Sequence, residues 1–145
     1  MVYAGRVSFE KRVDTFADAV HELRKSDAGR RLRFAVVGDG PALDWLKERL
    51  QGTPTVFTGF LEGDDLAAAY ASGDLFAFPS DSETLGFAAI EAMAAGVAVV
   101  AADAGGIPHI VKHGENGVLV PPGDGAALAS ELLRLVDDGE ERERL

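Results

Sequence analysis

Short apolar runs alternate with amphipathic segments along the whole chain. The apolar runs read as strands and are separated by turns rich in glycine or proline; they fall at residues 2–7, 32–38, 55–60, 74–79, 97–102 and 117–121. Helical patterns occupy the intervals, at residues 12–26, 41–51, 63–72, 86–95, 106–113 and 125–138. Continuously apolar strands that alternate with helices indicate a parallel sheet covered on both faces. The pattern therefore predicts a Rossmann-like, doubly wound α/β domain of about six strands.

Local signals refine three of the helices. In the first, Val13, Phe16, Val20 and Leu23 recur at helical spacing and predict a buried stripe. Pro41 is expected in the first turn of its helix, where the missing N–H costs nothing, and Asp64 or Asp65 is expected to cap the helix at 63–72. The charged tail "DDGEERERL" predicts a helix, or a link to another helix, that is cut short; a frayed terminus is the alternative.

Composition narrows the classes of function. The chain has 145 residues, 47% of them hydrophobic, enough for one compact domain spanning residues 1–145. A net charge of −10 argues against binding nucleic acid or an anionic membrane surface. The absence of cysteine excludes disulfides and thiolate metal sites and favours the cytoplasm. No apolar run is long enough to span a membrane.

Ligands of open α/β sheets bind beyond the carboxyl ends of the strands. Several familiar nucleotide motifs are missing from the loops expected there. "GDGPAL" follows a strand, but Leu43 stands where the dinucleotide fingerprint needs its third glycine. There is no Gly-Lys pair for a P-loop and no Asp-x-Asp clamp for a metal, and His21, His109 and His113 show no metal-ligand spacing. The remaining possibility is a phosphate site that uses no metal.

Such a site is predicted at the helix that begins near Gly86. Unpaired amides and the positive end of the helix dipole attract anions there. Arg6 and Lys11, in the first strand–helix loop, lie at the same edge of the predicted sheet and are suited to a diphosphate. The alternative is that both are solvated loop charges.

Glu91 is the only ionisable residue among the nineteen from Thr84 to Ala102. Glutamate is rarely buried without a partner, and the neighbouring sequence supplies none. A ribose would satisfy it, because a diol donates two hydrogen bonds to a carboxylate. Alternatively, Glu91 faces solvent or pairs with a distant arginine or lysine. Glu83, in the loop before the helix, is placed to meet whatever extends from the diphosphate, or else to cap the helix electrostatically.

Seven segments in order resemble the C-terminal domain of retaining glycosyltransferases of family 4, which have the GT-B fold: "GRVSFEK", "GDGP", "FTGFL", "AYASGDLFAFPS", "SETLGFAAIEAMAAGVAVVA", "AGGIPHIV" and "GENGVLVPPGD". The fourth and fifth are especially similar to enzymes that glycosylate lipids, such as sulfolipid synthases and phosphatidylinositol mannosyltransferases. The resemblance covers nearly the whole chain. Its most specific element is the E-x7-E pair of Glu83 and Glu91, joined to the upstream Gly-Arg and Glu-Lys.

The resemblance assigns roles to individual residues. It implies that Arg6 and Lys11 bind the donor diphosphate and stabilise the leaving group, that Glu91 accepts from the ribose hydroxyls, and that Glu83 lies at the donor sugar. Amides of Thr84, Leu85 and Gly86 would contact the sugar or phosphate, and the segment from Thr58 to Leu61, with Gly59 and Phe60, would hold the nucleobase. Such enzymes need no metal or cofactor beyond the nucleotide sugar and retain the anomeric configuration.

The expected function follows from these roles. The chain is expected to be the donor domain of a hexosyltransferase acting on a lipid, glycan or small molecule, in the cytoplasm or peripherally at the inner membrane in the full-length enzyme. The family's N-terminal domain, which holds most of the acceptor site, is absent from these 145 residues, so the isolated domain is expected to be inactive. The alternatives are a GT-B nucleotide-sugar epimerase and a non-catalytic scaffold or partner module. Two positions depart from the family: His109 replaces an acidic residue after "GGIP", and Ala98 replaces a frequent proline.

Overall fold

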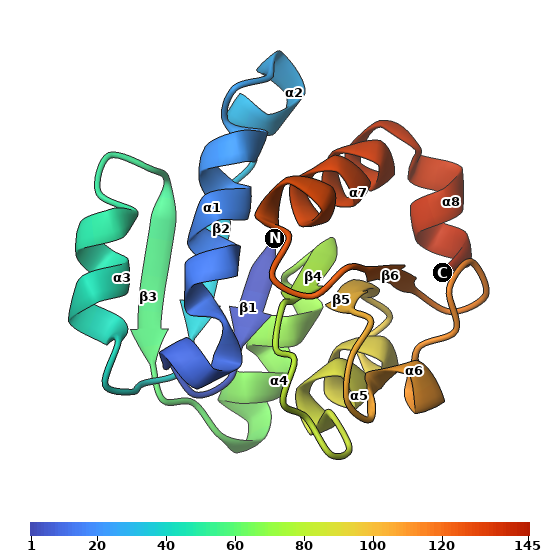
Figure 1. Ribbon diagram of the computed structural model, residues 1–145, viewed down its shortest axis with the longest axis horizontal. Coiled ribbons are helices and arrows are strands. Elements are labelled where there is room, and N and C mark those ends of the chain that lie inside the picture. Colours follow the sequence, from blue (N-terminus) through green and yellow to red (C-terminus); the bar gives the residue numbers. More distant parts are fainter.

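Six parallel strands form one sheet in the order β3-β2-β1-β4-β5-β6 in the computed structural model, which describes residues 1–145 (Figure 1). The strands are β1 (Val2–Ala4), β2 (Phe34–Val37), β3 (Thr55–Gly59), β4 (Leu75–Phe78), β5 (Ala98–Ala102) and β6 (Val118–Val120). The order runs outward from β1 in one direction and from β4 in the other, which places the topological switch point between these two strands. The predicted six-stranded, Rossmann-like α/β fold is confirmed.

Helices cover both faces of the sheet. They are the 3₁₀ helix η1 (Phe9–Lys11), α1 (Val13–Leu23), α2 (Asp27–Arg30), α3 (Leu43–Arg49), α4 (Gly63–Ala71), α5 (Phe87–Ala94), α6 (Ile107–Ile110), α7 (Gly125–Asp137) and α8 (Gly139–Arg144). One core cluster joins α1, α3 and α7 to one face of the sheet, and a second joins α4, α5 and α6 to the other. The tail predicted as a helix forms α8, which Asp138 begins by accepting from the Glu141 amide.

Burial explains why these segments fold as they do. The stripe predicted from Val13, Phe16, Val20 and Leu23 is buried in α1. Every residue of β4 and β5 is buried, as expected for central strands covered on both faces. At the sheet edge, β3 alternates between half-buried and exposed residues. The core therefore lies in two layers, one on each side of the sheet, and the central strands between them are fully buried.

Two of the local predictions were wrong. The N-cap of α4 is Glu62, which makes no side-chain capping bond, and Asp64 and Asp65 lie in the first turn, where their charge still favours the helix dipole. Pro41 lies in the turn before α3 rather than in the helix, whose first residue is Leu43. The turn before α3 is held by a hydrogen bond from the Ala42 amide to the Val7 carbonyl oxygen, a tertiary contact that short capping patterns do not encode.

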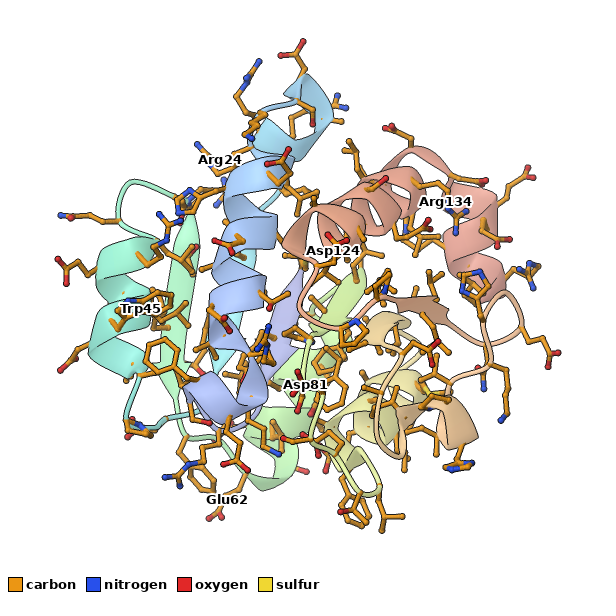
Figure 2. All side chains as sticks on the ribbon, viewed as in Figure 1. Arg24, Trp45, Glu62, Asp81, Asp124 and Arg134 are labelled. Carbon is orange, nitrogen blue, oxygen red and sulfur yellow. The ribbon has the colours of Figure 1, made fainter.

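The strands end at one edge of the sheet, and their loops gather there (Figure 1). Figure 2 shows Asp81 and Glu62 at this edge and Arg24 at the opposite end of the molecule. The predicted site residues belong to loops at this edge, to the last residue of β3 (Gly59) or to the helix that follows one of the loops.

Candidate functional site

A cavity of about 360 Å³ opens at the carboxyl edge of the sheet. Three of the predicted site residues, Arg6, Phe60 and Glu91, line it together. The other lining residues are Ala4, Gly5, Val37, Gly38, Asp39, Leu61, Leu66, Tyr70 and Ala88. The cavity therefore joins the ends of β1, β2 and β3 to helices α4 and α5. The remaining predicted residues do not line it: Lys11, Gly59, Glu83, Thr84, Leu85 and Gly86.

The floor of this cavity depends on two backbones that approach closely. A Cβ on Gly38 would lie 2.0 Å from the carbonyl oxygen of Gly5, and the φ of Gly38 is +136°, so only glycine fits there. Beside them, the buried Tyr3 hydroxyl donates to the carbonyl oxygen of Arg6 at 2.8 Å. Burial, and then the nearby charge of Glu83, raise the pKa of Tyr3 well above its ordinary value. Tyr3 thus remains a neutral donor that holds the backbone of Arg6.

Lys11 and Glu83 form an ion pair across the first and fourth strand–helix loops. Lys11 Nζ lies 2.7 Å from Glu83 Oε1, and the Ser80 hydroxyl donates to the same oxygen at 2.8 Å. Both charged side chains are partly buried. Both residues were predicted at this edge of the sheet, but their direct pairing was not predicted. Any anion that uses Lys11 has to compete with this carboxylate.

The start of α5 presents a run of free amide groups. The backbone N–H groups from Thr84 to Ala88 donate no hydrogen bond within the chain. Gly86, the N-cap residue, has a left-handed backbone with φ +64°, and a Cβ there would lie 2.4 Å from Ile107 Cδ1. Ala88 lines the cavity, so this turn borders the space that also contains the Arg6 side chain. Free amides at a helix N-terminus are suited to an anion.

The loop before α5 is held from behind by a second loop. Gly106, at the start of α6, donates to the carbonyl oxygen of Glu83 at 2.7 Å. A Cβ on Gly106 would stand 1.8 Å from the oxygen of Thr84, and one on Gly105 would stand 2.5 Å from that of Glu83. The glycine pair in "AGGIP" therefore allows direct contact between two backbones, a function that its sequence alone did not reveal.

Glu91 faces solvent, which is one of the two alternatives left open by the sequence. Its side chain and that of Phe87 are both exposed. The neighbouring sequence supplies no partner for it, but a distant residue does: the Tyr70 hydroxyl donates to Glu91 Oε2 at 2.8 Å. Tyr70 lies in α4, a different helix, and was not among the predicted site residues. Together they border a second cavity of about 430 Å³ between α4 and α5.

Arg12 is the only residue other than glycine with a left-handed backbone, at φ +59°. Its Nε lies 3.6 Å from Asp81 Oδ2 and 3.8 Å from Asp14 Oδ1. The pair with Asp81 links the β1–α1 loop to the β4–α5 loop, alongside the pair formed by Lys11 and Glu83. A non-glycine residue in this conformation is uncommon and costs energy, which its neighbours must offset.

Metal-ligating residues do not converge anywhere in the structure. No group of three or more histidine, aspartate or glutamate side chains is arranged to hold a metal ion. His21 Nε2 lies 2.8 Å from the Arg49 carbonyl oxygen, and His113 Nδ1 accepts from the Leu119 amide, so both have structural partners.

None of the helices has the length and apolar character needed to cross a membrane.

Comparisons of sequence and of structure with known proteins identify the same family. The family model described as "Glycosyl transferases group 1" matches residues 1–138. Sulfoquinovosyl transferase SQD2 of Arabidopsis thaliana is 42% identical over 146 residues, which cover 99% of this chain and 28% of the relative. This agrees with the resemblance to sulfolipid synthases.

Solved structures share the fold. Anabaena HepE in complex with UDP-glucose superposes with a TM-score of 0.85 at 29% identity, covering 99% of this chain and 41% of that one. The C-terminal domain of a group 1 glycosyl transferase, LpcC, from Francisella tularensis gives a TM-score of 0.84 at 27% identity, covering 99% of this chain and 78% of that one. The chain thus spans less than half of SQD2 and of HepE, but most of a protein described as a C-terminal domain. We conclude that the chain belongs to the group 1 glycosyl transferases and corresponds to their C-terminal GT-B domain.

Proposed function

We propose that this chain is the donor-binding domain of a retaining glycosyltransferase. It would hold a nucleoside diphosphate sugar, without a metal, for transfer to a lipid, glycan or small-molecule acceptor. The observation that carries the proposal is that Arg6, Glu91 and Ala88, which lies in the first turn of α5, line one cavity at the carboxyl edge of the sheet. The UDP-glucose complex of the similar HepE supports the choice of ligand class.

The diphosphate would lie against the free amides from Thr84 to Ala88, where the helix dipole also favours negative charge. Arg6 reaches the same cavity and can form two parallel hydrogen bonds to phosphate oxygens. Lys11 would add a second positive charge on leaving its pair with Glu83. These groups would together neutralise a diphosphate that has no bound cation.

The nucleoside would occupy the rest of the cavity. Glu91 would accept hydrogen bonds from the two ribose hydroxyls, for which an ionised carboxylate is the suited acceptor. The base would pack against Phe60, whose side chain is 73% exposed, and against Leu61. Burying that ring on a base would remove apolar surface from water and so favour binding. Gly59 would provide the turn that directs Phe60 toward the base.

Transfer would begin as the bond between the anomeric carbon and the diphosphate oxygen breaks. The acceptor oxygen forms its bond to the same face of that carbon, and its proton passes to the departing phosphate oxygen. Negative charge grows on the diphosphate during this step, so Arg6, Lys11 and the α5 amides stabilise the transition state more than the bound donor. Glu83, beside Lys11, would face the donor sugar.

The acceptor is expected to bind on a part of the enzyme outside these residues. Rapid transfer requires donor and acceptor to be held together. The domain alone is therefore expected to bind nucleotide and to turn over little or nothing. The similarity to a sulfoquinovosyl transferase favours a lipid among the three acceptor classes.

Calorimetric titration of UDP, GDP and ADP into the folded chain tests the proposal directly. At least one nucleotide is expected to bind, and Arg6→Ala should weaken it about 10- to 100-fold, because charged hydrogen bonds contribute about 1.5–3 kcal/mol. The salt dependence of binding should fall as well. Arg24→Ala is the matched control, since Arg24 lies at the far end of the molecule (Figure 2).

Two results would contradict the proposal. The first is no binding of any of the three nucleotides at millimolar concentration by a folded sample. The second is equal loss of affinity in the Arg6 and Arg24 variants, which would place the nucleotide elsewhere.

A further inference from the structure

The side chain of Glu91 has one hydrogen-bonding partner in the chain, the hydroxyl of Tyr70, at 2.8 Å. No other residue of α5 is charged, so no neighbour one turn away on the helix can hold the carboxylate. Glu91 is exposed, and a long exposed glutamate samples several rotamers. The bond from Tyr70 therefore decides which way this carboxylate faces in the absence of ligand.

The side chain of Tyr70 is buried and packed against the sheet. It is 4% exposed, and its ring packs on Phe76 with ring centroids 5.5 Å apart. Phe76 lies in the fully buried strand β4, so the ring is supported by the centre of the sheet. The hydroxyl is the part of Tyr70 that meets Glu91, at the boundary of the two cavities that both residues line. The core thus fixes a donor at the position where the proposed site needs its acceptor oriented.

We propose that Tyr70 is a positioning residue that preorients Glu91 for the ribose hydroxyls of the donor nucleotide. This rests on the proposed function, because it requires a ribose at Glu91. With Oε2 accepting from Tyr70, about three of the four lone pairs of the carboxylate remain free, which is enough for the two hydroxyls of a diol. A carboxylate already held in place loses less freedom when the ligand binds.

The effect should depend on the ribose hydroxyls, which makes it separable from a general effect on the fold. Tyr70→Phe keeps the buried ring and removes only the hydroxyl. For the nucleoside diphosphate that the wild type binds, affinity should fall about three- to tenfold, the cost of ordering one mobile side chain when the ligand binds. For the matching 2′,3′-dideoxynucleoside diphosphate, which offers Glu91 no hydroxyl, the same substitution should change affinity by less than about twofold.

A double-mutant cycle tests the same link with one ligand and two substitutions in the protein. Glu91→Ala removes the carboxylate, and adding Tyr70→Phe to it should cause no further loss of affinity, because the hydroxyl acts through Glu91. Ser72→Ala is the matched control: it removes a hydroxyl next to the end of α4 that donates to Ala69, and it should leave affinity unchanged. Urea unfolding of each variant verifies that the fold is retained.

The outcomes are distinct. Unchanged affinity for the ribonucleotide in Tyr70→Phe overturns the inference, and so does an equal loss for ribo- and dideoxynucleotide. In either case, if the wild-type protein still binds the ribonucleotide more tightly than the dideoxynucleotide, the donor-site proposal stands. A wild type that binds no nucleotide overturns both.

Discussion

Replacing Gly106 by alanine tests how the loop that carries Glu83 is kept in place. Gly106 has an ordinary backbone, with φ −82° and ψ −7°, so alanine can adopt its conformation without strain. The added Cβ, however, would stand 1.8 Å from the Thr84 carbonyl oxygen, whereas ordinary contact begins at 3.4 Å. The two loops would have to separate by roughly 1.5 Å, because both partners are backbone and neither can rotate away.

Separation is expected to destabilise the fold through two contributions. Overpacking a close contact costs about 1–3 kcal/mol. Moving the loops also breaks the hydrogen bond from the Gly106 amide to Glu83, a net loss of about 1 kcal/mol. The free energy of unfolding should fall by about 2–4 kcal/mol, which lowers Tm by about 6–12 °C in a domain of this size. The α5 amides would move with the loop, so nucleotide affinity should fall too.

Urea denaturation followed by fluorescence measures this change, because the chain has a single tryptophan, Trp45, which packs against Phe9. Gly139→Ala is the matched control: its Cβ would meet only a flexible Arg142 nitrogen, at 3.6 Å, and its φ is not positive. There alanine should stabilise by about 0.4–1 kcal/mol through the unfolded state. Equal stabilities for the two variants would refute the reasoning.

Three further predictions follow from other contacts. Glu83→Gln frees Lys11 from its 2.7 Å ion pair, so calorimetry should show nucleoside diphosphate binding about two- to fivefold tighter; weaker binding would contradict this. Burial, and then the bond to Glu91, raise the pKa of Tyr70 above its ordinary value of 10. The stability contributed by the neutral Tyr70 hydroxyl is therefore complete below pH 10 and is lost as the pH rises above it. Above pH 10, in urea titrations, the unfolding free energy of wild type should fall faster than that of Tyr70→Phe, by up to about 1.4 kcal/mol per pH unit; equal slopes would exclude the shift. Leu132→Ala, at a fully buried position in α7, should lose about 2.7–5 kcal/mol by thermal denaturation, whereas Leu85→Ala, 54% exposed, should stay within about 0.5; similar losses would contradict the assigned core.

Much of the fold could be predicted because its signal is local. Each of the six strands was found as a short apolar run, and the stripe on α1 was found from helical spacing. The helix starts were less accurate: Glu62, not an aspartate, is the N-cap of α4, and Pro41 lies outside α3. Caps depend on the angle at which the chain enters the helix, which is a tertiary property.

The candidate site was predicted at the correct edge of the sheet, but its internal contacts were not. Carboxyl ends of parallel strands meet at one edge, so Arg6 and Glu91 could be assigned to one site from topology alone. The ion pair of Lys11 with Glu83 could not, because these residues are 72 positions apart. Whether Glu91 is buried could not be decided from the sequence either, because α5 buries only Ala89 and Ala92 and this apolar helix still has an exposed face, where Glu91 lies.

The order of hydrophobic and polar positions determined the class of fold, the number of strands and the edge where a ligand would bind. Strands that are buried on both faces are continuously apolar, and the helices that cover them have apolar residues at helical spacing, so both leave a recognisable pattern in the sequence. Only the tertiary structure decided which side chains form hydrogen bonds, ion pairs and close contacts with one another. Tyr70 meets Glu91 across two helices and 21 positions, and the glycines of one loop meet the backbone of another. Such contacts depend on how whole layers pack, and no local pattern records them.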